Sequence, residues 1–251
     1  MFVLEELKDL LGFLKLGNEK RKLEIVVISG AGISAASGIR TFRDNDGLWE
    51  EYDVYDVATP EAWAANPELV QRFYNERRKQ LLSVKPNGGH LAIADLEEIA
   101  NVTIVTQNVD DLHERGGSSN VLHLHGELKK AQSSINADLI YDIDGWELKM
   151  GDLCALGSQL RPHVVWFGEA VPKMVEAEIL VEKADLVIVV GTSLNVYPAA
   201  GLLYNVNRDV PLVVVDPSEM NLKAWPNAMH WKAKAEDALP QFKDYLIHIL
   251  K

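Results

Sequence analysis

The sequence predicts an α/β fold in which a doubly wound, Rossmann-like parallel sheet carries a smaller inserted module. Short apolar runs typical of buried strands recur along the chain. These runs are residues 23–29, 101–106, 121–124, 163–167, 186–190 and 211–215. Segments with helical character alternate with them, at residues 67–84, 89–99, 172–183, 198–207 and 236–250. Such alternation predicts parallel strands joined by helices that cover both faces of the sheet.

The opening segment, residues 1–16, is predicted to form an amphipathic helix. Its apolar residues, Leu4 and Leu7 among them, recur at spacings of three and four. Charged residues such as Glu5 and Lys8 interrupt the segment, unlike the continuous apolar core of a signal peptide or a membrane span. We therefore expect a cytoplasmic protein with no membrane association.

Residues 129–159 break the alternation of strands and helices. They are polar, contain three glycines and include two short runs, 139–143 and 146–150, which we interpret as a hairpin. We expect one catalytic domain, 1–251, with two parts. The Rossmann-like core takes approximately 20–35, 86–126 and 161–251, and the small module takes approximately 36–85 and 127–160.

Composition excludes several classes of protein. The 251 residues are 47% hydrophobic and 25% charged, as in ordinary globular proteins with a substantial core. Lys and Arg total 25 against 37 Asp and Glu, and no stretch concentrates basic residues, so nucleic-acid binding is not expected. Cys154 is the single cysteine, which excludes an intrachain disulfide and a four-thiolate zinc site. We expect a monomer.

The first chemical motif is Gly30-Ala31-Gly32-Ile33-Ser34, directly after an apolar strand. Glycines at this point allow a tight turn and a close approach of the main chain to a pyrophosphate. By themselves, Gly30 and Gly32 are equally compatible with an ordinary strand-to-helix turn.

The second and third motifs also lie at strand ends. Gln107 and Asn108 have side chains that donate and accept, which suits ribose hydroxyls and a carboxamide, whereas Asp110 only accepts. A polar loop with an Asx cap is the alternative. His123 and His125 follow the next apolar run; we expect no metal there, because a third ligand is not evident nearby.

Two later motifs complete the set. Residues 161–169 read as an extended, partly apolar strand that suits peptide addition, with a buried core strand as the alternative. Residues 191–200 follow an apolar strand and begin a helix, a position that can bind phosphate or ribose. A simple turn with a Ser or Thr cap is the alternative.

Together these motifs resemble the sirtuin family, in family order from Gly30 to Asp216. The run from Gly30 to Arg43 is similar to the sirtuin signature, and residues 106–113 to its Q-N-V-D-x-L-H block. The resemblance implies NAD as cofactor and an acyl-lysine protein or peptide as substrate. The dinucleotide contacts that the motifs and the resemblance indicate are Gly30, Ala31, Gly32, Ser34, Thr41, Phe42, Arg43, Gln107, Asn108, Asp110, Gly191, Thr192, Ser193 and Asp216.

The resemblance also implies a mechanism. His125 matches the catalytic histidine and activates a ribose hydroxyl, while Asn108 and Asp110 position nicotinamide as it leaves. Val165, Phe167 and Gly168 match positions near the acyl-lysine channel. The expected products are nicotinamide, free lysine and O-acyl-ADP-ribose.

Tyr74 and Arg77 share one face of a predicted helix, where a phenol and a guanidinium suit a terminal carboxylate. The surrounding sequence resembles class III sirtuins, which remove succinyl and malonyl groups, so we expect a preference for acidic acyl groups together with possible deacetylation. A solvated face formed by residues 77–79 is the alternative. The sequence lacks the four zinc cysteines that most sirtuins have, and no zinc is expected.

Two other activities are compatible with a dinucleotide site. A protein ADP-ribosyltransferase would use the same site with a different acceptor. A non-catalytic NAD-sensing module would bind the dinucleotide without consuming it, although binding alone does not require a base such as His125.

Overall fold

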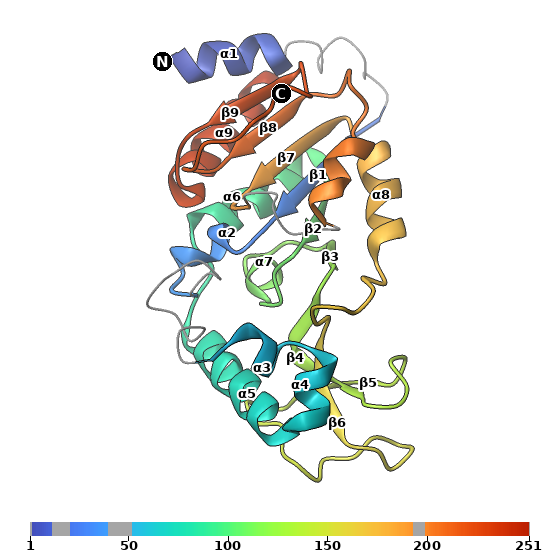
Figure 1. Cartoon of the computed structure of the whole chain (residues 1–251). Coiled ribbons are helices and arrows are strands. Elements are labelled where there is room, and N and C mark those ends of the chain that lie inside the picture. Colours follow the sequence, from blue (N-terminus) through green and yellow to red (C-terminus); the bar gives the residue numbers. More distant parts are fainter. Residues whose placement is uncertain (1, 12–20, 40–51, 193–198, 251) are drawn as a thin grey trace.

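The larger sheet contains six parallel strands in the order β3-β2-β1-β7-β8-β9 (Figure 1). The computed structural model describes residues 2–11, 21–39, 52–192 and 199–250. The strands are β1 (Leu23–Ser29), β2 (Ala100–Thr106), β3 (Val121–His123), β7 (Leu186–Val190), β8 (Leu212–Val215) and β9 (Ala228–Trp231). The predicted doubly wound α/β fold is confirmed. The strand order reverses between β1 and β7, the point at which such sheets bind ligands.

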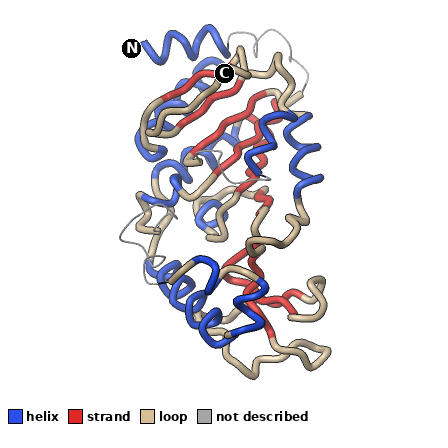
Figure 2. Tube along the Cα trace, in the orientation of Figure 1, coloured by secondary structure: helices blue, strands red, loops and turns tan. Residues whose placement is uncertain are grey.

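Both faces of this sheet are buried under helices (Figure 2). Because successive side chains of a strand point to opposite faces, Val27 of β1 packs in one apolar cluster and Val26 in the other. The first face is covered by α1 (Phe2–Leu11), α6 (Gly88–Asp95) and α9 (Ala235–Leu250). The second is covered by α8 (Met174–Glu182) and the 3-10 helix η4 (Ala199–Asn205).

A second, antiparallel sheet lies at the other end of the molecule from α1 and β9 (Figure 1). Its order is β5-β4-β6, with β4 (Gly126–Ser133), β5 (Ile140–Asp142) and β6 (Leu160–Val164). Three helices pack beside it, namely α3 (Val54–Val57), α4 (Pro60–Ala65) and α5 (Pro67–Ser83). The predicted hairpin of 139–143 with 146–150 is wrong in its pairing: the first run contains β5, which pairs antiparallel with β4 instead, Ala131 lying opposite Tyr141.

Helix α5 has a clear local origin. The side chain of Asn66 accepts a hydrogen bond from the Leu69 amide at 3.1 Å, and Pro67 occupies the first turn, where its missing N–H costs nothing. Shorter helices are α2 (Gly32–Ala35), α7 (Leu112–Arg115) and the 3-10 turn η3 (Leu96–Glu98). Within the described ranges, none of the helices combines the length and the apolar character that spanning a bilayer requires.

Several predicted elements need correction. The strand predicted at 163–167 lies at Leu160–Val164, because its pairing with β4 ends at Val164 and the Phe167 amide donates to the Ala58 carbonyl instead. Residues 146–150 form no strand, since side chains of α5 take their hydrogen bonds. Strand β9 was not predicted, because it is only partly buried and His230 interrupts its apolar residues, whereas the equally short β8 is a continuous apolar run.

Candidate functional site

Three glycines bring two loops together where the strand order reverses. The Gly30 amide donates to the Val190 carbonyl at 3.0 Å, and the Gly32 amide to the Gly191 carbonyl at 2.8 Å. Gly191 has φ +61°, and a Cβ on it would lie 2.2 Å from the Ile33 nitrogen. No side chain fits at this junction, so glycine is required for the loops after β1 and β7 to meet.

Ser34, Asn108 and Asp110 are buried beside this junction in one hydrogen-bonded group. The Ser34 hydroxyl donates to Asp110 Oδ2 at 3.0 Å, and Asn108 Nδ2 lies 3.3 Å from Ser34 Oγ and 3.2 Å from the Gly30 carbonyl. Burial raises the pKa of Asp110, although the Leu112 amide and the Ser34 hydroxyl act against it. The ends of β1 and β2 thus bring Ser34 together with Asn108 and Asp110, which lie more than 70 residues further along the chain.

His125 is held by the same loop. Its Nδ1 lies 3.1 Å from the Gln107 carbonyl, which only accepts, so Nδ1 carries the hydrogen. Burial lowers the pKa of His125, with the Gln107 contact acting against it. The ring is therefore neutral at pH 7 and Nε2 has a lone pair, as a general base requires. Gln107 also reaches Thr192 across the junction, with Nε2 3.3 Å from the threonine hydroxyl.

Asp216 lies at the carboxyl end of β8, on the same edge of the sheet as Thr192, and both residues are buried. One oxygen of the Asp216 carboxylate accepts from the Ser218 amide at 2.8 Å. The His230 ring lies 2.9 Å from the Asp216 main-chain carbonyl. The loop that carries Asp216 is therefore fixed from two sides. Ala31, another predicted dinucleotide contact, is half-buried at the start of α2.

Tyr74 and Arg77 lie on α5, which packs against the three-stranded sheet. The Tyr74 hydroxyl accepts from the Trp166 indole at 3.0 Å, and burial raises the pKa of Tyr74 to about 12. Arg77 is half-buried, with its guanidinium 5.6 Å from the Phe73 ring centroid. Burial lowers the pKa of Arg77, whereas the nearby Tyr74 and Asp110 raise it. At pH 7 Tyr74 is thus neutral and can donate a hydrogen bond. Arg77 is a cation whose charge is stabilised by the carboxylate of Asp110.

The segment after β6 runs directly past His125. The Val165 amide donates to the His125 main-chain carbonyl at 2.9 Å. Val165 is half-buried, whereas Phe167 has 48% of its surface exposed and Gly168, at φ +90°, is also exposed. This arrangement places an accessible aromatic residue and an open stretch of main chain beside the candidate base.

Four of the predicted dinucleotide contacts, Thr41, Phe42, Arg43 and Ser193, lie outside the described residues. Among the described ones, Ser34, Asn108 and Asp110 form one hydrogen-bonded group, and the predicted catalytic residue His125 binds the Gln107 carbonyl of the same loop.

Two groups of polar side chains were not predicted from the sequence, one of them fully buried. Arg78 is 0% exposed, so a solvated face at residues 77–79 is the wrong interpretation for this residue. His123, Glu114 and Glu127 form a group in which the potential ligand atoms lie within 4.8 Å of one another, although the two glutamates were not expected near the histidine. The patterns around these residues gave no local signal, since their partners come from other elements.

The surroundings of Cys154 do not fit a tetrahedral zinc site. Its sulfur lies 3.1 Å from the Ser158 hydroxyl and 3.3 Å from the Leu156 amide. Apolar side chains, including Ile143 and Leu160, pack around it in a small cluster. A zinc site needs four nitrogen, sulfur or carboxylate ligands, and this region supplies one thiol.

Comparison with known proteins gives consistent matches. The model of the Sir2 family matches residues 30–198. A protein from Bacteroides thetaiotaomicron named NAD-dependent protein deacylase is 51% identical over 228 residues, covering 89% of this chain and 97% of its own. A protein of the same name from Helicobacter pylori is 50% identical over 227 residues, covering 90% and 98%. The crystal structure of a Sir2 homologue in complex with NAD has a TM-score of 0.80 at 38% identity, covering 90% of each chain.

Proposed function

The chain belongs to the Sir2 family, and we propose that its activity as an NAD-dependent protein deacylase is directed to lysine side chains that carry acidic acyl groups. One observation supports the site most directly. Ser34, Asn108 and Asp110 form a buried hydrogen-bonded group beside a neutral His125, at the edge of the sheet where the strand order reverses. Doubly wound sheets bind dinucleotides at this edge.

Each residue has a role that its chemistry supports. Bound NAD would supply the ribose carbon to which the acyl oxygen bonds as the bond to nicotinamide breaks, and the products would be nicotinamide, free lysine and O-acyl-ADP-ribose. Asn108 and Asp110 hold the nicotinamide end, with Ser34 fixing the Asp110 carboxylate. His125 Nε2 takes the proton of a ribose hydroxyl. The two loops joined by the glycine junction, with Asp216 farther along the edge, hold the rest of the dinucleotide.

The substrate lies, in this proposal, along Val165, Phe167 and Gly168. The open main chain there can hydrogen-bond an extended peptide, and the exposed Phe167 ring can cover the aliphatic stem of the modified lysine.

The acyl preference rests on Tyr74 and Arg77. The Tyr74 hydroxyl oxygen accepts from Trp166, which leaves its own hydrogen available for donation. A phenol with a pKa of about 12 keeps that hydrogen at pH 7. An arginine stays charged in proteins, and a guanidinium beside a phenol can donate several bonds to one terminal carboxylate. Trp166 connects this pair to the Val165–Gly168 segment.

The test compares two acyl groups on one peptide. Wild type, Arg77→Met and the exposed same-helix control Arg72→Met receive the peptide with acetyl-lysine or succinyl-lysine, and NAD-dependent deacylation is measured. We expect wild type to prefer succinyl, and Arg77→Met to lose about 100-fold in kcat/KM for succinyl only, since it removes a partly desolvated charge pair. Equal losses on both peptides, or a preference for acetyl, would exclude the acidic-acyl proposal.

The same assay separates the two other activities. Transfer of ADP-ribose to protein without release of an acyl group would indicate an ADP-ribosyltransferase. Binding of NAD with no consumption would indicate a sensor module.

We also propose that the protein needs no zinc, because the apolar cluster around Cys154 occupies the region where zinc cysteines are expected. Metal analysis of the purified, active enzyme tests this: one zinc per chain would contradict it. A monomeric state, a cytoplasmic location and the division into core and small module stay predictions.

A further inference from the structure

Two histidines that are two residues apart bind consecutive carbonyls of one loop. His125 Nδ1 lies 3.1 Å from the Gln107 carbonyl, and His123 Nδ1 lies 2.9 Å from the Asn108 carbonyl. The loop that they hold carries the Asn108 and Asp110 side chains. His125 has a role in the proposed function, whereas His123 has none there.

The second ring nitrogen distinguishes the two histidines. His123 Nε2 lies 2.7 Å from Glu114 Oε1 on α7. The Asn108 carbonyl and the Glu114 carboxylate can only accept, so both ring nitrogens of His123 must carry hydrogen. His123 is therefore an imidazolium, with 7% of its side chain exposed, whereas His125 is a neutral ring.

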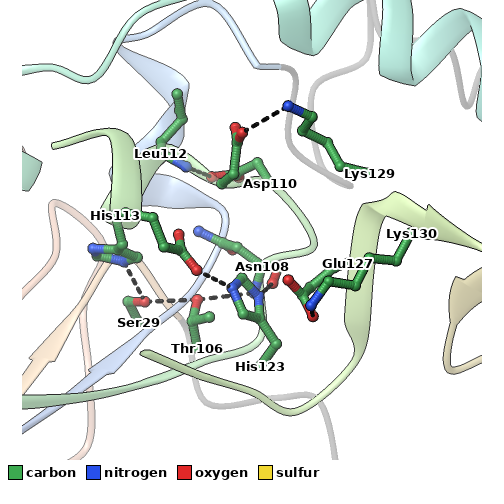
Figure 3. A network of polar contacts seen from close by, with 12 residues as sticks. Ser29, Thr106, Asn108, Asp110, Leu112, His113, His123, Glu127, Lys129 and Lys130 are labelled. Carbon is green, nitrogen blue, oxygen red and sulfur yellow. Dashed lines mark hydrogen bonds and ion pairs between the residues drawn. The ribbon is translucent and has the colours of Figure 1, made fainter. Parts of the chain in front are cut away.

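The charged groups around His123 agree with this assignment. On β4, Glu127 faces the ring and is itself paired with Lys130 at 2.9 Å (Figure 3). Burial acts to lower the pKa of His123, but Glu114, the Asn108 carbonyl and Glu127 together raise it above the ordinary value.

The positive charge of His123 also reaches other titratable groups. It lowers the pKa of Asp110, and so stabilises that carboxylate, although burial has the larger, opposite effect. It also contributes to the lowered pKa of His113 on α7 and of His163 on β6, for both of which burial is the main cause. The charge of His123 thus influences the pKa of two other histidines and of the buried Asp110.

We propose that His123 is a positioning residue that works as a buried cation: it fixes the Asn108 main chain, and with it the Asn108 amide and the Asp110 carboxylate, for deacylation. The proposal rests on the proposed function, because it assigns His123 to the same site. The remaining contacts of Asn108 show why one carbonyl matters. The main-chain N–H of Asn108 donates to the Thr106 hydroxyl at 3.0 Å, and its main-chain carbonyl accepts from His123 (Figure 3). Together the two contacts fix the peptide groups that precede and follow the Asn108 side chain.

A metal ion is the competing occupant of the Glu114–His123–Glu127 group, and the geometry favours the proton. Ligand atoms of one tetrahedral zinc lie about 3.3 Å apart, given bonds of about 2.0 Å. The distance of 2.7 Å between Glu114 and His123 is that of a charge-assisted hydrogen bond. Lys130 already pairs with the Glu127 carboxylate.

The first test does not depend on activity. Long-range proton–nitrogen NMR spectra of the histidine rings, assigned with His123→Gln and His125→Gln, report which ring nitrogens carry hydrogen. At pH 7.5 we expect both nitrogens of His123 to be protonated and Nε2 of His125 to be bare. A neutral His123 ring at this pH would overturn the proposal, whatever the enzyme's activity.

The second test is a pH profile of kcat and KM for wild type, Glu114→Gln and the exposed control Glu176→Gln. Without the Glu114 charge, His123 loses its proton at lower pH. We expect the alkaline limb of kcat to move down by about one pH unit, while the acid limb, set by His125, stays in place. The control should match wild type.

The outcomes separate this inference from the proposed function. If wild type and Glu114→Gln are both active and the alkaline limbs of their kcat profiles coincide, the role of His123 is refuted while the proposed deacylase function stands. A wild type that turns over no acyl peptide would refute the function, while the NMR result still decides the charge of His123. Loss of activity in EDTA and its recovery with Zn²⁺ would indicate that a metal ion, and not a protonated His123, occupies the Glu114–His123–Glu127 group. This result would overturn the proposal.

Discussion

The two sheets of this protein are held together by different means. In the six-stranded sheet, all five residues of β7 are buried and apolar, and clusters pack against both faces. In the three-stranded sheet, the cluster around Cys154 contains five buried residues, and a second cluster packs Leu128 of β4 and Val164 of β6 against α3, α4 and α5. Side chains of α5 add polar contacts: Arg78 donates to the Leu128 and Trp146 carbonyls, at 2.6 and 2.7 Å. This module thus combines smaller apolar clusters with buried polar side chains of a neighbouring helix.

The largest effect is expected for Arg78→Met. The change leaves the Leu128 and Trp146 carbonyls without their donor, and each unsatisfied buried group costs about 1–3 kcal/mol. We expect the free energy of unfolding to fall by about 4 kcal/mol. Urea unfolding of Arg78→Met and of the exposed control Arg72→Met, which should change by less than about 0.5 kcal/mol, measures this. If both variants match wild type, the small module is held by its apolar clusters alone.

The next effect concerns a buried polar group on the side of the larger sheet. His90 on α6 is 0% exposed, and burial lowers its pKa to about 4, against an ordinary value of 6.5. The folded protein therefore binds fewer protons than the unfolded chain between these values, and stability is lost as the pH falls from about 6.5 to about 4. This difference corresponds to about 3 kcal/mol.

The variant His90→Gln sharpens this prediction. Glutamine at the third helical position can accept from the Asn87 amide as His90 does, so the helix cap is kept while the titration is removed. Urea midpoints from pH 7.5 to 4.0 should fall less steeply in the variant. Parallel curves would mean that His90 stays neutral in both states or is charged in both.

A smaller effect is expected for Asn75→Ala in the small module. The Asn75 amide exchanges two hydrogen bonds with the main chain of Leu148, at 2.9 and 3.0 Å, and accepts one from Arg78. Asn75 is half-buried, so water can replace part of these contacts, and we expect a loss of about 1–2 kcal/mol. In the double variant with Arg78→Met, the two losses should not add, because the residues share one network.

The smallest effect is expected for Arg21→Met at the edge of the larger sheet. Arg21 forms two bonds of 2.7 Å to the Asp185 carboxylate, yet its side chain is 51% exposed. Exposed ion pairs contribute little, so the urea midpoint should not change measurably. A clear loss of stability here would remove the contrast between the two regions.

The sequence was sufficient where structure depends on local pattern. Strands β1 and β7 have the bounds that their apolar runs predicted, because a strand buried on both faces is a continuous apolar run. The grouping of Asn108 near Gly30 also followed from the pattern, since carboxyl ends of neighbouring parallel strands meet at one edge.

Contacts between distant segments were not predictable in the same way. The partners of Arg78 lie 50 and 68 residues away, and the partner of Tyr74 lies 92 residues away. Glu114 and His123 are closer in sequence but belong to α7 and β3, which do not share a periodic pattern. These pairs depend on how the two sheets and α5 pack, which no local signal specifies.

Deacylation by His125→Ala tests the central claim most directly. Wild type and variant are given NAD and a succinyl-lysine peptide, and NAD binding is measured by calorimetry on the same samples. We expect turnover to fall by about 10³-fold while the Kd for NAD changes little, because the variant removes the base and keeps the glycine junction. A variant that deacylates at the wild-type rate would contradict the account.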